Sequence, residues 1–144
     1  MGDRLGPILF QTPPTLRRDD ETLAGFVASL PGDVRCALEV RHPSWYAREV
    51  YDLLAARHVA LVYDDGEGHA PSPLETVGAT ASFAYLRLRS AVPYDDAALE
   101  RWAALMREQL AAGRDAYAYL RHDEDGAMGV AAVKLRALVP ASCS

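Results

Sequence analysis

Five polar side chains in this sequence stand where they could bind and act on a small molecule. Glu39 and Arg41 alternate with apolar residues in one run, and Arg87 and Arg89 do so in a second run. Because successive side chains of a strand point to opposite faces, the charges of each run share one face. Gln11 ends an earlier apolar run in the same manner. We therefore expect these side chains to point toward the inner side of one sheet.

These residue types indicate a site that binds an anionic substrate. Guanidinium groups bind phosphate and carboxylate through paired hydrogen bonds. Arg41, Arg87 and Arg89 are therefore predicted to bind a small anionic or phosphorylated substrate, which Gln11 would orient. Nothing in the sequence indicates which bond of that substrate would be broken.

Glu39 and His42 are the candidates for proton transfer. A carboxylate or an imidazole can act as a general acid or base near neutral pH. Each residue also has a structural interpretation, which stays open. Glu39 and Arg87 could form an ion pair inside the fold, because an isolated charge in an apolar run is costly. His42 could instead hydrogen-bond to the backbone ahead of a helix.

Other side chains support further hypotheses. Trp45 could stack on a substrate ring, although core packing is the use that we favour. Glu39, His42 and Asp64 could hold a divalent ion and make the chain a metal-dependent, nuclease-like hydrolase. The four histidines lack metal-ligand spacing and the two cysteines form no CxxC pair, so no zinc site and no cofactor are predicted. We favour a plainer interpretation, as solvated loop or surface residues, for Asp64, Asp65, Asp123, His58, His69 and His122.

Length and composition limit the class of protein. The 144 residues are 50% hydrophobic and 24% charged, which is typical of one globular domain over residues 1–144. The net charge of −5 gives no chain-wide attraction for nucleic acid. No apolar stretch approaches the ~18 residues of a membrane span, and the first residues do not begin a signal peptide. A cytoplasmic location follows by default, with Cys36 and Cys143 reduced.

The apolar pattern alternates between short runs and helical periodicity. The short runs predict strands at 7–11, 36–41, 59–63, 83–88 and 116–120. Helices are predicted from Asp19 to about residue 30, after Ser44, from Asp95 or Asp96 to Gly113, and over 130–138. Polar loops are predicted at 64–82 and 121–129.

Strands joined through helices predict a parallel sheet. No glycine fingerprint follows the first run, which disfavours a dinucleotide-binding open sheet. The prediction is an α/β fold, the C-terminal portion of a TIM-like (β/α) barrel with about five parallel strands. Five units are too few for an eight-stranded barrel of ~250 residues, so we expect the first βα units to be missing. An unpaired edge strand favours self-association, or pairing with the missing N-terminal half.

Three segments resemble the YecE-like family, known as domain of unknown function 72. They are the segment 5–14 (LGPILFQTPP), the segment 39–45 (EVRHPSW) and the segment 85–88 (YLRL). The resemblance implies a TIM-barrel-like fold and no established reaction. By position, the polar residues of the family's motifs are matched by Gln11, Glu39, Arg41, His42 and Arg87. The chain departs at Arg89, where the family often has histidine, and at residues 121–123, where it often has an Asn-Asn pair.

Three functional hypotheses follow. The first is an enzyme that binds a small anion at the carboxyl ends of the strands. The second is the metal-dependent hydrolase described above. The third is a truncated or split half-barrel without catalysis that works only with a partner or by pairing with itself.

Overall fold

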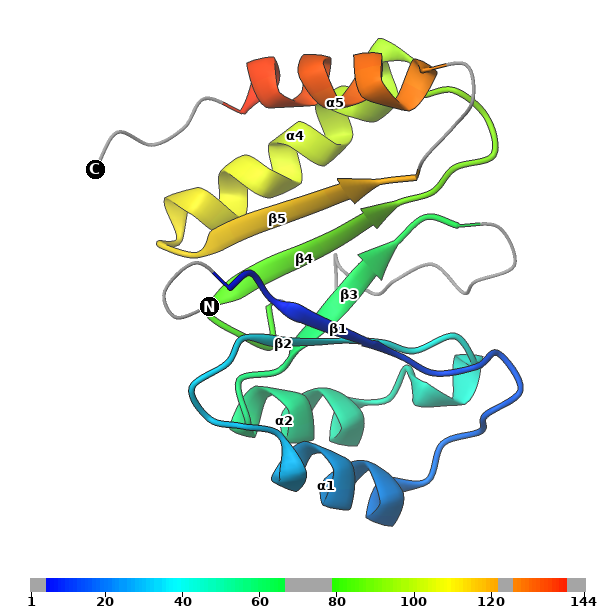
Figure 1. Ribbon diagram of the computed structural model, residues 1–144, viewed down its shortest axis with the longest axis vertical. Coiled ribbons are helices and arrows are strands. Elements are labelled where there is room, and N and C mark those ends of the chain that lie inside the picture. The colour runs from blue at the N-terminus through cyan, green and yellow to red at the C-terminus, as the bar shows by residue number, and fades with distance from the viewer. Residues whose placement is uncertain (1–4, 67–78, 122–125, 140–144) are drawn as a thin grey trace.

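A curved parallel sheet is the framework of the chain. The computed structural model describes residues 5–66, 79–121 and 126–139 (Figure 1). Its five strands lie in chain order and pair in parallel: β1 (Ile8–Gln11), β2 (Cys36–Glu39), β3 (Ala60–Asp64), β4 (Phe83–Leu88) and β5 (Asp115–Leu120). The prediction of an α/β half-barrel with five parallel strands is confirmed.

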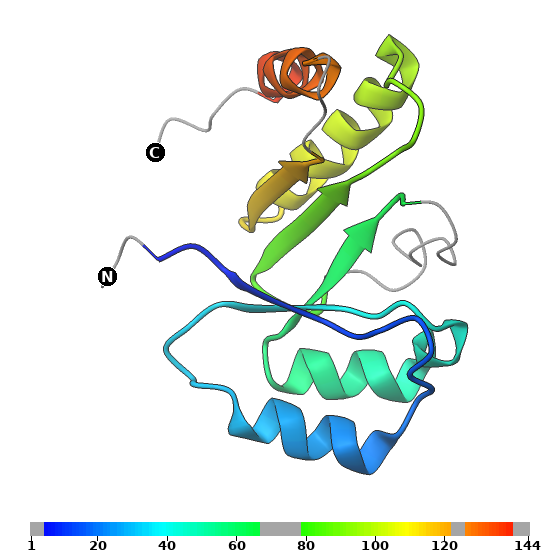
Figure 2. The ribbon, with the colours of Figure 1, turned by 45° about the vertical axis from the view of Figure 1, so that its right-hand side comes forward.

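Helices cover the outer face of this sheet in two pairs. In Figures 1 and 2, α1 (Asp20–Ser29) and α2 (Arg48–Ala56) lie together along one flank, and α4 (Asp96–Ala111) and α5 (Ala127–Leu138) along the other. The N-caps Asp19 and Asp95 start α1 and α4, because each carboxylate accepts a hydrogen bond from a first-turn backbone N–H. None of the helices in these ranges has both the length and the apolarity needed to cross a bilayer.

The alternation along each strand decides what faces outward. Leu38 packs with α1 and α2, and Leu86 packs with α4 and α5. The residues of opposite parity form an inner cluster that includes Val62, Phe83 and Tyr85. Glu39 and Arg87 have this inner parity, so the strand pattern places them on the concave side, as expected.

The curl of the sheet brings side chains of distant strands together. Arg35, just before β2, forms an ion pair with Asp115 at the start of β5, with Nη1 2.7 Å from Oδ2. The same guanidinium lies over the rings of Phe83 and Tyr117, 5.7 and 5.8 Å from their centroids. These contacts join the amino ends of β2, β4 and β5, although β2 and β5 are not neighbours in the sheet.

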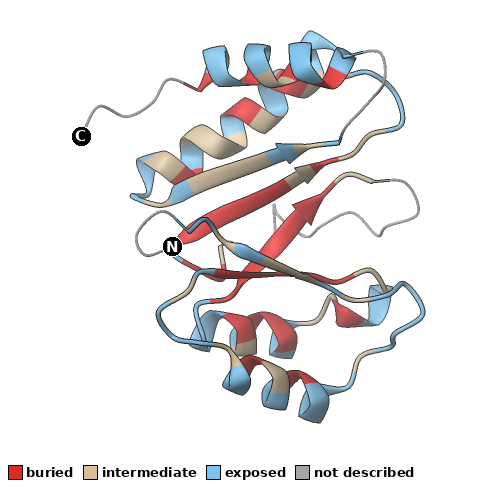
Figure 3. Cartoon of the chain, in the orientation of Figure 1, coloured by how far each residue is buried: buried red, intermediate tan, exposed pale blue. Residues whose placement is uncertain are grey.

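The two outer strands differ from the middle ones. β2 and β3 are buried throughout and β4 nearly so, whereas β1 and β5 are partly exposed (Figure 3). Within the described ranges, β1 and β5 each pair on one side only. The association expected through such an edge stays a prediction.

Of the boundaries that differ from the sequence prediction, three change how an element is described. β2 ends at Glu39, so Arg41 lies in the following loop. The helix expected after Ser44 is two elements, a 3-10 turn η2 (Pro43–Trp45) and then α2, because His42 caps the turn and Ala47 interrupts it in extended conformation. The last helix begins at Ala127, after Gly126 at a φ of 75°. Several residues assigned to loops or termini lie outside the described ranges: His69, His122, Asp123 and Cys143.

Candidate functional site

The carboxyl ends of β1 to β4 gather the polar residues of the concave side. The register pairs Gln11 of β1 with Glu39 of β2, and Asp64 of β3 with Arg87 of β4. Side chains at paired positions of parallel strands share a face. The four side chains therefore share the concave face, and hydrogen bonds from Arg87 to Gln11 and Glu39 join the two pairs into one polar layer at the inner rim, which is where β/α barrels carry their active sites.

Glu39 is the centre of this layer. It is 1% exposed, and both of its carboxylate oxygens accept hydrogen bonds from arginines. Oε1 accepts from Arg41 Nε at 2.8 Å and from Arg89 Nη2 at 3.1 Å, while Oε2 accepts from Arg87 Nη1. A charge this deeply buried is tolerated only when it is paired in this way. The structure thus contains the ion pair between Glu39 and Arg87 that was one of the two interpretations of these residues.

Gln11 joins two of the arginines. Its side-chain oxygen accepts from Arg41 Nη2 and from Arg87 Nη1, each at 2.9 Å. The backbone fixes the two loops beside it, because Thr12 N donates to the Glu39 carbonyl at 2.9 Å and Arg41 N donates to Thr12 Oγ1 at 3.3 Å. The loops after β1 and β2 therefore hold Gln11 and Arg41 next to each other.

Arg89 connects this cluster to the end of β3. Its guanidinium donates to both oxygens of Asp64, with Nε 3.3 Å from Oδ1, and its backbone N–H donates to Asp65 Oδ1 at 2.6 Å. Tyr94 completes the network by donating its hydroxyl to Asp65 Oδ2 at 2.6 Å and accepting from Ser90 N at 3.1 Å. The three arginine side chains are 18–23% exposed, so each keeps some contact with solvent.

The interpretation of Asp64 as a solvated loop charge is wrong, whereas Asp65 does lie in the loop after β3 and is half-buried. Asp64 is 8% exposed and lies inside the network. A signal for this was available in the sequence, since Asp64 directly continues the buried run 60–63 and has the same parity as Val62. Tyr94, in the loop before α4, was also missed. No periodicity in the sequence relates a tyrosine in this loop to Asp65, which directly follows β3.

The electrostatic environment acts on the groups around the cluster. Burial alone would lower the pKa of the Arg89 guanidinium, but its hydrogen bond to Asp64 and the charges of Glu39 and Asp64 raise that pKa above its ordinary value. Burial, assisted by the charge of Asp64, raises the pKa of the Tyr46 hydroxyl to about 12. Burial and the hydrogen bond to Asp65 raise the pKa of Tyr94 as well. These groups therefore keep one protonation state at neutral pH.

Several donors of the cluster have no acceptor among the described residues. A guanidinium carries five N–H donors. Arg41 uses Nε and Nη2, and Arg87 uses Nη1, in the bonds above. Arg41 Nη1 and Arg87 Nε and Nη2 make no hydrogen bond within these ranges. A ligand with several acceptor oxygens at the mouth of the layer would meet these donors.

His42 and Trp45 follow Arg41 in the chain, and Trp45 packs in the core between the sheet and helices α1 and α2. The His42 ring accepts from Ser44 N at 3.1 Å and lies 2.8 Å from Ser44 Oγ through Nδ1, so it caps η2. Nε2 makes no hydrogen bond with a described residue. Trp45 is 2% exposed and donates Nε1–H to the Leu16 carbonyl at 2.8 Å, which is the environment of a packing residue. Its contact with substrate stays a prediction.

The metal hypothesis gains no support from the side-chain geometry. Among the described residues, no three His, Cys, Asp or Glu side chains group as ligands of one ion. Glu39 and Asp64 direct their oxygens to guanidinium groups, which compete with a cation for the same lone pairs. We therefore do not carry this hypothesis into the proposed function.

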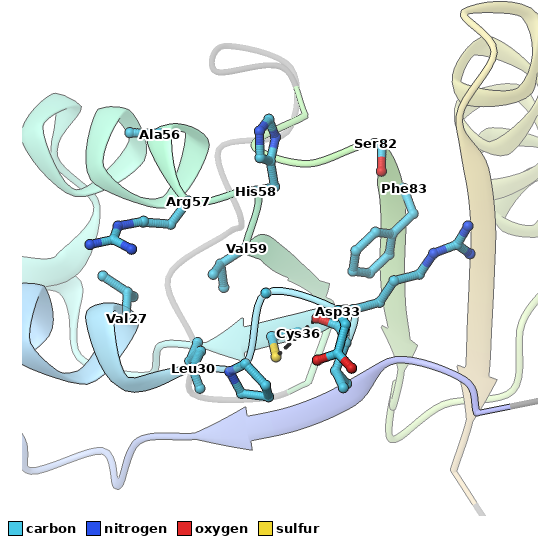
Figure 4. A pocket seen from close by; sticks show the side chains of 14 residues that line it. Val27, Leu30, Asp33, Cys36, Ala56, Arg57, His58, Val59, Ser82 and Phe83 are labelled. Atoms are coloured by element: carbon cyan, nitrogen blue, oxygen red, sulfur yellow. Dashed lines mark hydrogen bonds between the residues drawn. The ribbon is translucent and has the colours of Figure 1, made fainter. Parts of the chain in front are cut away.

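A cavity of about 340 Å³ lies at the opposite, amino end of the strands (Figure 4). Its lining includes apolar Val27 and Phe83, the thiol of Cys36 and the polar side chains of Arg57 and His58. The cavity and the charged cluster are thus at different ends of the sheet. We place the candidate site at the cluster, because buried, mutually oriented charges lie there and because the amino ends of barrel strands serve stability rather than binding.

The fold and this rim define the chain as a parallel (β/α) half-barrel with a charged layer at its carboxyl end. The family model described as "Protein of unknown function DUF72" matches residues 1–142, so the chain belongs to the DUF72 family. The resemblance to the YecE-like family is thereby confirmed. No curated protein matches the chain at a significant level.

Solved structures of the same family have the same fold. A DUF72 family protein from Thermotoga maritima is 22% identical, with a TM-score of 0.80, and the match covers 94% of this chain and 58% of that one. A DUF72 family protein from Enterococcus faecalis is 16% identical, with a TM-score of 0.79, and the match covers 97% of this chain and 63% of that one. At these identities the likeness shows the fold alone, and the chain spans about three fifths of the length of either relative.

Proposed function

We propose that this chain binds a small anion, a phosphorylated or carboxylated molecule, at the carboxyl ends of β1 to β4. The observation that carries the proposal is the set of N–H donors on Arg41 and Arg87 that have no described acceptor, beside the buried carboxylate of Glu39. Phosphate and carboxylate present several oxygens in the geometry that a guanidinium fork recognises.

The affinity would come from directed donors rather than from a long-range field. The cluster contains three guanidinium groups and three carboxylates, those of Glu39, Asp64 and Asp65, so its formal charges balance. The carboxylates fix the arginines in place before a ligand arrives, which lowers the entropy lost on binding. A hydrogen bond to an ionised group at a partly buried site is also stronger than one in open solvent.

Glu39 acts in this proposal as a positioning residue. Its oxygens already accept from Arg41, Arg87 and Arg89, so taking a proton from substrate would require that network to open. Proton transfer by Glu39 or by His42 stays a prediction. Of the two, His42 has a ring nitrogen without a described partner, and it lies directly after Arg41 at the same rim.

Titration calorimetry with inorganic phosphate and with acetate tests the proposal. We expect saturable binding of at least one of them to the wild-type chain, and binding at least about tenfold weaker in Arg87→Ala, because hydrogen bonds to charged groups contribute about 1.5–3 kcal/mol each. Arg48→Ala is the matched control, since Arg48 is 82% exposed and pairs with Asp52 on α2. It should bind like the wild type.

A second variant separates binding from folding. Arg87→Lys keeps the positive charge and loses the planar fork, so it should fold and bind more weakly than the wild type. If Arg87→Ala and Arg87→Lys both bound the two anions as the wild type does, or if the wild type bound neither anion, the proposal would be wrong.

A further inference from the structure

An exposed tyrosine stands next to the arginine cluster on the concave side. Tyr119 of β5 is the register partner of Arg87 of β4, so the two side chains share the inner face of the sheet. Tyr119 is 44% exposed, although it lies on the same face as the buried inner cluster. Strands β4 and β5 are neighbours, and neighbouring strands lie about 5 Å apart. The Tyr119 ring is therefore close to the strand that carries Arg87.

A second tyrosine supports this ring. Tyr85 and Tyr119 stack with their centroids 4.8 Å apart and an interplanar angle of 21°. Tyr85 is 5% exposed and belongs to the inner cluster with Phe83 and Val62. One face of Tyr119 is therefore covered by a ring that is itself held in the core, and the surface that remains exposed belongs to a ring of fixed orientation.

Scattered exposed apolar residues are ordinary on a protein surface, and Val92 and Val133 are examples in this chain. Tyr119 differs from them in two respects. It is stacked on a buried partner, and it neighbours guanidinium N–H donors that have no described acceptor. A stacked aromatic ring beside anion-binding groups is suited to a ligand with an anionic group and a planar ring.

The geometry points to a ligand in which a phosphate or carboxylate bound by Arg41 and Arg87 is attached to a planar ring that stacks on Tyr119. This inference rests on the proposed anion-binding function and names the class of ligand. A single ligand would then contact the loop after β2, strand β4 and strand β5 at once, with its charge at the centre of the rim and its ring toward the edge of the sheet.

Three phosphates of graded shape test the inference by titration calorimetry. Inorganic phosphate has the charge alone, cyclohexyl phosphate adds a puckered apolar ring, and phenyl phosphate adds a planar one. We expect phenyl phosphate to bind wild-type chain about three- to tenfold more tightly than the other two, which is the range of one aromatic pair. Equal affinities for phenyl and cyclohexyl phosphate would overturn the inference.

Variants of Tyr119 assign the preference to this ring. Tyr119→Ala should bind phenyl phosphate no more tightly than inorganic phosphate, while Tyr119→Phe should keep the preference. Val92→Ala is the control for loss of an exposed apolar side chain. If Tyr119→Ala failed to fold, as judged by its thermal melt, the comparison of the two esters in the wild type and in Tyr119→Phe would decide.

The two proposals fail in different ways. If the wild type bound none of the three phosphates, the anion-binding function itself would be wrong. If it bound inorganic phosphate and showed no preference for phenyl phosphate, the anion site would stand and the ring-binding inference alone would be wrong.

Discussion

Gln11 and Arg87 are 76 residues apart in sequence and lie on strands that are not neighbours, yet the Arg87 guanidinium donates to the Gln11 side-chain oxygen at 2.9 Å. The contact exists because the sheet curls, so that inner-facing side chains of β1 and β4 meet across its concave side. This single hydrogen bond therefore reports both the curvature of the half-barrel and the placement of the candidate site.

Glu39→Gln tests how far the cluster depends on its central charge. The amide keeps the shape of the side chain and removes the negative charge that three arginines share. We expect the free energy of unfolding to fall by about 3 kcal/mol, the cost of breaking a buried ion pair by removing one partner. Urea unfolding monitored by circular dichroism measures it.

Glu49→Gln is the matched control for that substitution. Glu49 also pairs with an arginine, Arg18, but its side chain is 69% exposed. Exposed ion pairs contribute about 0–1 kcal/mol, so this variant should unfold close to the wild type. Equal effects at Glu39 and Glu49 would contradict the central role of Glu39.

Tyr94→Phe removes the hydroxyl that closes the network at Asp65. The variant loses one hydrogen bond to a carboxylate and one from the Ser90 backbone, and we expect a loss of about 1–3 kcal/mol in the free energy of unfolding. The affinity for phosphate should fall as well, because Asp65 would then hold the Arg89 backbone less rigidly. An unchanged phosphate affinity would show that the Asp65 contact is not needed to position Arg89.

Stability should decrease at alkaline pH. Tyr63 is 4% exposed, and burial raises the pKa of its hydroxyl from 10 in the unfolded chain to about 12 in the fold. Since the folded-state pKa is the higher one, the contribution of Tyr63 is fully present below pH 10 and is lost as the pH rises through 12. Urea unfolding at a series of pH values across this window measures the loss.

Tyr63→Phe provides the comparison for the pH dependence. Phenylalanine cannot ionise, so the alkaline loss of stability should be smaller in this variant, with Tyr46, whose pKa is also raised to about 12, contributing to the remainder. Identical pH profiles for the two proteins would show that Tyr63 is not among the groups whose ionisation opposes folding.

Divalent cations should leave the thermal stability of the chain unchanged. The oxygens of Glu39 and Asp64 accept from guanidinium groups, so Mg²⁺, Mn²⁺ or Zn²⁺ would have to displace arginines that are already bound. Melting curves with each chloride salt, against NaCl at equal ionic strength, measure this. A clear rise in melting temperature that Asp64→Asn abolishes would revive the metal hypothesis.

The sequence determined the fold class and the face on which each strand residue lies. Alternation within 36–41 and 83–89 was sufficient to send Glu39 and Arg87 to the concave side, because side-chain direction in a strand depends on parity alone. The same local rules placed a helix start at Asp19 and a cap at Asp95 or Asp96, and the structure has its caps at Asp19 and Asp95. They also predicted Gln11, Arg41 and Arg89 as members of one rim.

Which of these residues meet depends on the folded arrangement of the strands. Contacts between strands depend on register and on the curl of the sheet, and neither is encoded within a single segment. Curvature brings Gln11 to Arg87, and register places Tyr119 beside Arg87. The sequence predicts a loop charge at Asp64, because a residue that ends a strand can enter either the core or solvent. Its ion pair with Arg89, which directly follows β4, is what makes its burial favourable.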